Sequence, residues 1–123
     1  MKDSISNLIT IVKNGSRSKK DSVTVPRSKF VEAVAAALAR KGYVKPAKAD
    51  KSGQSIEIGL IQGRITDAKR LSKPSKRLYK GYEEIHAVKQ GYGSTFVSTP
   101  KGILSDDEAR KEKVGGEILF QIW

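Results

Sequence analysis

The sequence predicts an α+β protein built from two small lobes: an α-β-α-β-β amino-terminal lobe over residues 1–62, and a mainly β carboxyl-terminal lobe over residues 63–123 with one short helix. Three observations lead to this prediction. The first half holds two segments with helical apolar periodicity, and the second half is mostly extended between turn residues. The length of 123 residues suffices for one domain or for two lobes of about sixty residues with thin cores.

A first helix is predicted over residues 4–14, because apolar residues recur there at every third or fourth position. Asp3 or Ser4 is expected to cap its start, and Gly15 is expected to end it. The apolar stripe consists of Ile5, Leu8, Ile9 and Val12.

A strand and a second helix follow. Residues 22–25 alternate as a short strand that Pro26 ends, and Ser28 is expected to cap a helix over residues 29–41. Its alanines favour helix, and Gly42 supplies the left-handed stop. The side chains expected to face the core are Phe30, Val31, Val34 and Leu38.

Extended chain completes the first lobe. Tyr43-Val44 is predicted to be extended, with Pro46 at an edge or a bend. Ser52-Gly53 is predicted to be a turn, after which residues 56–60 alternate as a strand that ends near Gly63.

The second lobe is predicted to be mainly extended. A weak strand is expected within residues 64–72, a turn at residues 73–75, extended chain at Leu78-Tyr79 and one helical turn within residues 82–87.

A strand, a short helix and a last strand are predicted next. Residues 94–99 form the first strand. Ser105 followed by the acidic residues 106–108 predicts a helix start, because carboxylates complement the positive end of the helix dipole. Gly115-Gly116 is expected to end this helix, and the apolar residues 117–123 predict a buried terminal strand.

The charge pattern favours a polyanionic partner. Lys and Arg number 24 against 13 Asp and Glu, a formal net charge of +11. The excess gathers in residues 13–29, which contain one acid, and in residues 69–80, which contain none. Two such basic segments on a small chain are typical of nucleic-acid binding, although a merely solvated surface is the alternative.

Several function classes are disfavoured. The chain has no cysteine and one histidine, His86, which leaves no thiolate site and little for an imidazole metal site. The longest apolar run, residues 33–39, is far too short to span a membrane, and the first residues lack a secretory signal pattern. We therefore expect a cytoplasmic protein without cofactor, membrane or small-molecule partner.

An enzyme would have to use Glu83-Glu84, His86 or Asp106-Asp107-Glu108 as acid–base groups or Mg²⁺ ligands. Adjacent residues in a strand point to opposite faces, and the aspartates lie where a helix start needs them. We therefore expect no enzyme. A basic architectural nucleic-acid-binding protein remains the alternative, although neither basic segment looks like a recognition helix.

Three segments, taken in order and spacing, carry a family resemblance. They read DSI and NG within residues 3–15 followed by VTVPRSK at 23–29, LSKPSKRLY at 71–79, and GSTFVSTPKGILSD at 93–106 followed by VGGEI at 114–118. Over essentially its whole length the chain resembles the bacterial small-subunit ribosomal protein S-eight family, the eighth protein of the small-subunit series. The third segment is the most specific.

The resemblance implies a structural constituent of the small ribosomal subunit. Members of that family bind small-subunit ribosomal RNA directly, chiefly at an irregular stem of the central domain, and help the subunit assemble beside neighbouring ribosomal proteins. In bacteria several members also bind a similar stem in messenger RNA and repress their own synthesis. The family's two lobes match the organisation predicted above.

The resemblance also implies RNA-binding residues. The main motif falls on Ser98, Thr99, Lys101 and Gly102, with support from Lys76, Arg77 and Tyr79 and with Glu117 nearby, whereas Thr24, Pro26, Ser28 and Lys29 lie along the RNA backbone. Their chemistry fits, because short hydroxyls suit base edges or a 2′-hydroxyl, basic groups suit phosphate and an aromatic ring suits stacking.

Structural roles for these residues stay open. In the second lobe, Ser98-Thr99-Pro100 would then only end a strand, Tyr79 would be a half-buried strand residue, and Glu117 would orient a hydroxyl or a basic side chain. Lys73 and Lys76 would only be solvated. In the first lobe, Thr24 would be a strand residue and Ser28 a helix cap.

The chain departs from the family pattern at three positions. Pro100 stands where the family commonly has a second serine, which removes a hydroxyl and a backbone N–H. Ile11 stands where arginine is frequent, and Ser4 stands where proline is frequent. The effect of Pro100 on the loop is open at this point.

Overall fold

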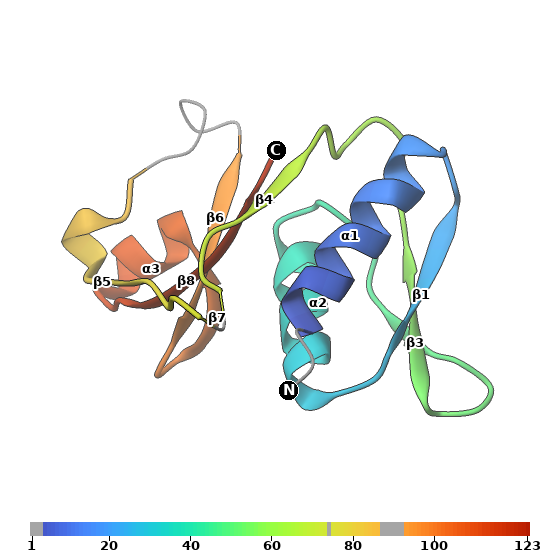
Figure 1. Cartoon of the computed structure of the whole chain (residues 1–123), viewed down its shortest axis with the longest axis horizontal. Helices are drawn as coiled ribbons and strands as arrows, with labels where there is room; N and C mark the ends of the chain where they lie inside the picture. Colours follow the sequence, from blue (N-terminus) through green and yellow to red (C-terminus); the bar gives the residue numbers. More distant parts are fainter. Residues whose placement is uncertain (1–3, 74, 87–92) are drawn as a thin grey trace. The chain divides into compact units, whose positions relative to one another are not determined.

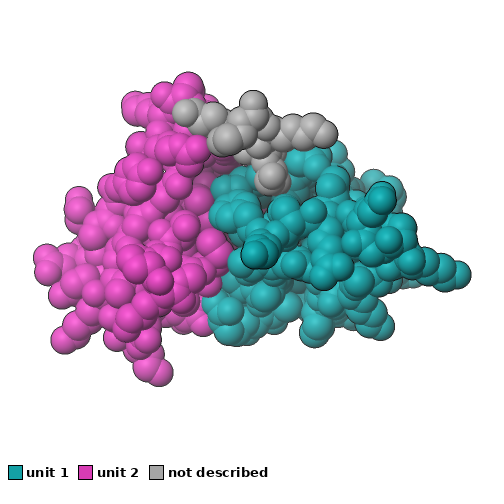
Figure 2. All heavy atoms as spheres, turned by 90° about the horizontal axis from the view of Figure 1, so that it is seen from below, with its two compact units in different colours: residues 1–66 teal, residues 67–123 magenta. Residues whose placement is uncertain are grey.

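The computed structural model describes residues 4–73, 75–86 and 93–123. Helices and antiparallel sheets both occur, which confirms the α+β class. The chain divides into two compact units, residues 1–66 and residues 67–123, which Figure 2 draws in different colours. The division lies a few residues beyond the predicted lobe boundary.

The first unit consists, in its described residues, of α1 (Ser4–Arg17), β1 (Ser22–Pro26), α2 (Lys29–Arg40), β2 (Lys48–Ala49) and β3 (Ser55–Gly59). This order is the predicted α-β-α-β-β. The strands form an antiparallel sheet in the order β1-β3-β2; β1 and β3 are labelled in Figure 1. Alternate residues of β1 and β3 are buried, because successive side chains of a strand point to opposite faces.

Gly15 was predicted to end helix α1, but the helix continues to Arg17. Gly15 is buried, and a Cβ atom built there would lie 2.4 Å from Cγ1 of Val23 and 3.0 Å from Cδ1 of Leu60. The glycine therefore allows close packing inside the unit instead of stopping the helix. The expected cap Asp3 lies outside the described residues.

Replacing Gly15 with alanine is expected to lower the free energy of unfolding by up to about 2 kcal/mol. Helix propensity favours alanine by about 1 kcal/mol, but overpacking a filled site costs roughly 1–3 kcal/mol. Urea unfolding measures the difference, with Asn14→Ala as the control at the exposed neighbouring position of the same helix. A more stable Gly15→Ala protein would contradict this account.

Helix α2 begins as predicted. The Oγ of Ser28 accepts a hydrogen bond from the backbone N–H of Val31 at 3.1 Å, and Gly42 follows the helix with a φ of 80°. The prediction for Phe30 is wrong, because its side chain is 36% exposed. Phe30 directly precedes Val31, about 100° away around the helix from the buried stripe.

The second strand of this unit lies later than predicted. Tyr43-Val44 contributes a single bridge, between Val44 and Leu60, and the strand that pairs with β3 is β2. Tyr43 is buried, and the guanidinium of Arg64 lies 4.0 Å from the centre of its ring. Tyr43 and Val44 therefore contribute mainly buried side chains to the core of the unit, and only one bridge to its sheet.

The second unit consists, in its described residues, of β4 (Ala68–Arg70), β5 (Tyr79–Lys80), the 3₁₀ helix η1 (Tyr82–Glu84), β6 (Ser94–Thr99), β7 (Gly102–Ser105), α3 (Asp106–Glu112) and β8 (Gly116–Ile122). Its antiparallel sheet has the order β4-β8-β6-β7, and β5 also pairs with β8 (Figure 1). The predicted terminal strand is confirmed, and it is the strand that joins β4, β5 and β6.

Several expectations for this unit need correction. The weak strand expected within residues 64–72 is only β4, and α3 ends on Lys113, whose φ is 56°, and not on the two glycines. Of the turn predicted at residues 73–75 and the helical turn within residues 82–87, Pro74 and Ala87 lie outside the described residues.

One face of this sheet carries a hydrophobic core. Ile85, Val97, Ala109 and Ile118 are buried together, and Leu71, Leu78 and Leu104 pack against them. Because Ala109 belongs to α3, this helix covers the face of β6 and β8 that presents Val97 and Ile118. Residues that alternate with Val97 and Ile118 therefore point to the opposite face.

Candidate nucleic-acid interface

Strands β5, β8 and β6 bring three predicted site residues together. Tyr79 pairs with Glu117, and Glu117 pairs with Ser98. Side chains of directly opposed residues lie on the same face of a sheet, so these three form one row, which we call the cross-strand row. The ring of Tyr79 is 66% exposed, which excludes the half-buried alternative and leaves it available for stacking.

The predicted loop is a tight hairpin between β6 and β7. Thr99 pairs with Gly102, which leaves Pro100 and Lys101 as the connection. The hydroxyl of Thr99 donates a hydrogen bond to the carbonyl of Gly102 at 2.8 Å and accepts one from the N–H of Lys101 at 3.1 Å. Gly102 has a φ of 110°, which strongly favours glycine. The Thr99 hydroxyl therefore shapes the turn.

Pro100 fits this hairpin. It occupies the first position of the turn, which favours the φ of about −65° that the proline ring fixes. The backbone N–H that proline lacks is not needed as a donor at this position. Both hydrogen bonds of Thr99 form beside it. Relative to a serine, Pro100 therefore removes a hydroxyl but keeps the turn closed.

Ser98 differs from Thr99. Its side chain is partly buried in the cross-strand row, and within the described part of the chain its hydroxyl has no hydrogen-bond partner. Such a hydroxyl can still donate one hydrogen bond and accept others. Of the two hydroxyls predicted for the site, Ser98 is the one free to bind a ligand.

Glu117 anchors the segment that carries the basic residues. Its carboxylate accepts hydrogen bonds from the hydroxyl of Ser72 at 2.6 Å and from Arg77 at 3.1 Å. Ser72 is only 2% exposed and accepts a further hydrogen bond from the N–H of Leu78 at 3.0 Å. Glu117 therefore orients both a hydroxyl and a basic side chain, the role left open by the sequence.

Arg70 completes this anchor. Its Nε donates to the carbonyl of Ser72 at 2.5 Å. Burial lowers the pKa of Arg70, and the negative charge of Glu117 opposes that shift. Sequence reasoning missed Ser72 and Arg70 as supports of the site, because Ser72 and Glu117 are 45 residues apart and only the sheet register brings them together.

The lysines of the predicted site remain at the surface. Lys73 and Lys76 exchange backbone hydrogen bonds of 3.0 and 2.9 Å in a tight turn, and both side chains are exposed. The Nζ of Lys101 lies 3.6 Å from a carboxylate oxygen of Glu112, and these side chains are 56% and 50% exposed. Lys76 is thus available to a phosphate, whereas Lys101 has a local competitor.

The predicted residues of the first unit lie around the start of α2. Thr24 and Pro26 are exposed on β1, and Lys29 is exposed at the first helical position. Ser28 serves as the helix cap, the structural role that the sequence had left open. These four belong to the first unit and the other predicted residues to the second.

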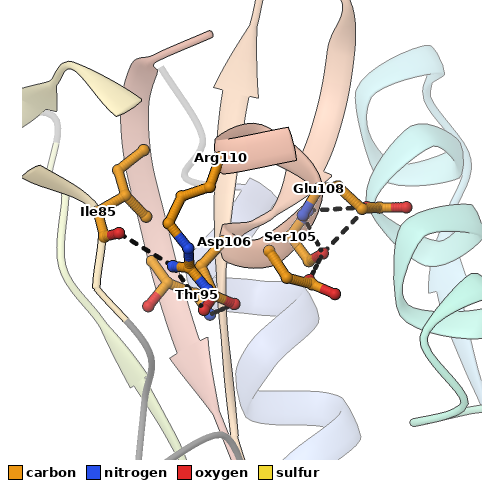
Figure 3. A network of polar contacts seen from close by, with 7 residues as sticks. Ile85, Thr95, Ser105, Asp106, Glu108 and Arg110 are labelled. Atoms are coloured by element: carbon orange, nitrogen blue, oxygen red, sulfur yellow. Dashed lines mark hydrogen bonds and ion pairs between the residues drawn. The ribbon is translucent and has the colours of Figure 1, made fainter. Parts of the chain in front are cut away.

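The acidic cluster around α3 is used for structure. Asp106 forms an ion pair with Arg110 at 3.2 Å and accepts a hydrogen bond from the N–H of Thr95 at 3.2 Å (Figure 3). Ser105 and Glu108 form a reciprocal capping box at the helix start. Asp106, Asp107 and Glu108, one of the carboxylate groups considered for an enzyme, are therefore engaged at the start of the helix.

The described residues contain neither a metal-binding cluster nor a membrane-spanning helix. No group of three or more His, Asp or Glu side chains there could hold a metal ion. No helix there combines the length and the apolar character needed to cross a membrane.

Comparison with known proteins agrees with the predicted resemblance. The family described as Ribosomal protein S8 matches residues 3–123. The chain is 42% identical over 129 residues to the small ribosomal subunit protein uS8 of Erythrobacter litoralis, an alignment that covers 100% of this chain and 98% of the relative. It is 41% identical over 127 residues to the protein of that name from Rhizorhabdus wittichii, which covers 98% and 97%. It is 40% identical over 128 residues to the one from Campylobacter fetus, which covers 98% of each. The chain therefore belongs to the ribosomal protein S8 family and is a structural, non-enzymatic protein of the small ribosomal subunit.

Proposed function

We propose that this protein binds small-subunit ribosomal RNA directly, at an irregular stem of the central domain, and thereby helps the subunit assemble. The observation that carries the proposal is the cross-strand row, in which the unpartnered hydroxyl of Ser98 lies on the same face as the exposed ring of Tyr79. The family and the names of the relatives support ribosomal RNA as the ligand.

The geometry of RNA explains why the target is an irregular stem. A regular RNA helix hides its base edges in a deep, narrow groove, so sequence is read where bases are splayed or distorted. Tyr79 would stack on such a base, and the Ser98 hydroxyl would bind a base edge or a 2′-hydroxyl. The positive φ and missing side chain of Gly102 let the RNA approach the hairpin backbone.

Basic side chains would supply most of the affinity. Lys76 and Lys101 would each contact phosphate, and Arg77 would present its free guanidinium nitrogens from the position that Glu117 gives it. In the first unit, four exposed residues would lie along the RNA backbone: Thr24, Pro26, Ser28 and Lys29. We expect these contacts to be indifferent to base sequence.

Replacing Glu112 with glutamine is expected to strengthen RNA binding by up to about fivefold. An exposed ion pair is worth roughly 0–1 kcal/mol, so the release of Lys101 can contribute at most that amount. Binding to the central-domain stem at constant salt measures the effect. Glu83→Gln, at an exposed acid of the same unit that has no partner among the described residues, controls for net charge. Equal gains in both variants would show that the pair with Lys101 is irrelevant.

The same surface would accept a similar stem in messenger RNA. We include binding to the protein's own message, and contact with neighbouring ribosomal proteins, in this proposal. The support for both is membership of the family.

The deciding experiment compares a central-domain stem of small-subunit ribosomal RNA with a scrambled duplex across a salt series. Each contacted phosphate contributes about 0.7–0.9 to the slope of log affinity against log salt, so six contacts would give roughly −4 to −5 for both RNAs. A preference for the central-domain stem that persists at high salt would support the proposal. Equal binding that disappears with salt would leave a basic architectural nucleic-acid-binding protein.

A further inference from the structure

Two consecutive glycines, Gly115 and Gly116, lie where β8 enters the sheet. Among the described residues the glycines with positive φ are Gly42, Gly53, Gly63 and Gly102, so neither Gly115 nor Gly116 has a backbone conformation that requires glycine. They do not end α3 either, since that helix stops on Lys113. The need for glycine at these two positions must therefore come from the atoms that surround them.

That space is filled by the backbone of two other strands. A Cβ atom built on Gly116 would lie 1.9 Å from the carbonyl oxygen of Ser98 and 3.2 Å from Cα of Thr99. A Cβ atom built on Gly115 would lie 2.2 Å from the carbonyl oxygen of Lys80 and 2.7 Å from Cα of Gly81. Backbone atoms cannot rotate away as a side chain can.

The two glycines face the two sides of the candidate site. Strand β6, which carries Ser98, and strand β5, which carries Tyr79, both pair with β8 through Glu117. Gly116 is in contact with the Ser98 strand, and Gly115 is in contact with the chain that follows Tyr79. Each glycine therefore limits the distance of one flank from β8.

We propose that Gly115 and Gly116 are positioning residues that set the spacing of the cross-strand row, and that this spacing determines which RNA the row selects. The inference rests on the proposed function and deepens it. Because real Cβ atoms do not approach within 3.0 Å of other heavy atoms, an alanine at position 116 would displace the Ser98 backbone by about 1 Å. Hydrogen bonds weaken steeply with such changes in distance and angle.

The first test is Gly116→Ala, alone and combined with Ser98→Ala. The preference for the central-domain stem over a scrambled duplex is expected to fall about tenfold, and Ser98→Ala should then have no further effect. Binding to the scrambled duplex should change little, because Lys76 and Lys29 lie outside β6 and β8, and only Lys101 among the proposed lysine contacts lies next to β6. Far-ultraviolet circular dichroism and thermal unfolding establish that the variant is folded.

The second test is Gly115→Ala, alone and combined with Tyr79→Ala. Here the contribution of Tyr79 to binding should disappear, while Ser98→Ala should keep its full effect. Gly59→Ala is the control in the first unit, because the three atoms nearest to a Cβ built there all belong to the side chain of Lys45, at 3.0–3.4 Å, and none belongs to backbone. This control should bind both RNAs as the unchanged protein does.

Each outcome decides a separate point. If the unchanged protein has no preference between the two RNAs, the proposed function is wrong. If it has the preference and folded Gly116→Ala and Gly115→Ala proteins keep it, with Ser98 and Tyr79 still contributing, the spacing proposal is overturned. An unfolded Gly116→Ala protein would make that glycine a requirement of the fold, and would overturn the proposal for that position.

Discussion

Replacing Ser98 with alanine is expected to reduce the preference for the central-domain stem by about 5- to 30-fold. A hydrogen-bonding group of the RNA that loses its partner costs roughly 1–2 kcal/mol, which corresponds to that range. The reason lies in this hydroxyl: it belongs to the cross-strand row and has no hydrogen-bond partner within the described chain, so under the proposed function it would form its hydrogen bond with the RNA. Equilibrium binding to the stem and to a scrambled duplex measures the change.

Two further variants distinguish an effect on selectivity between RNAs from an effect on overall affinity. Lys76→Ala should weaken binding to both RNAs alike and reduce the salt slope by about 0.7–0.9, because it removes one phosphate contact. Thr99→Ser should bind nearly as the unchanged protein does, since it keeps the hydroxyl that bonds to Gly102 and Lys101. An equal loss on both RNAs for Ser98→Ala would refute the division of labour between hydroxyl and lysine.

Replacing Asp106 with alanine is expected to lower the free energy of unfolding by about 2–3 kcal/mol. Breaking a buried ion pair costs roughly 3–5 kcal/mol, and the partial exposure of Arg110, 35% for its side chain, reduces that cost. The substitution also leaves the N–H of Thr95 without its acceptor, and among the described residues Arg110 then keeps only its hydrogen bond to the carbonyl of Ile85 (Figure 3). Chemical denaturation measures the loss.

Asp107 provides a matched control for this prediction. It is the next residue of the same helix start, but it is exposed. Carboxylates at a helix start contribute about 0.3–1 kcal/mol through the dipole. The Ser105 hydroxyl that donates to Asp107 also lies 3.1 Å from a carboxylate oxygen of Glu108, which can replace Asp107 as acceptor, so Asp107→Ala should cost no more than about 1 kcal/mol. Similar losses for the two variants would mean that Asp106 acts only as a helix-start acid, and not as the link between α3, β6 and η1.

Elements with local signals could be predicted from the sequence. Helix α2 was found from its cap Ser28 and its stop Gly42, because both act within a few residues of the helix they bound. The start of α3 at Ser105 and the strands β6 and β8 were found in the same way. Phe30 was misplaced because one step around a helix separates a buried position from an exposed one.

The features that sequence reasoning missed depend on partners far along the chain. Gly15 looked like a helix stop, but its neighbours Val23 and Leu60 make it a packing position. The hydrogen bond between Ser72 and Glu117 follows from sheet register, which no local pattern encodes. The family resemblance supplied the candidate residues. Only the structure shows that the hydroxyl of Thr99 is used within the hairpin, whereas that of Ser98 has no partner among the described residues.

The position of β8 in the chain has a consequence for synthesis. A ribosome makes proteins from the amino end, so β8 emerges after every other strand of the second unit. Because β4, β5 and β6 all pair with β8, their sheet cannot assemble on a nascent chain that stops before residue 117. Incomplete chains would therefore lack the cross-strand row and, under the proposed function, would not compete with finished copies for RNA.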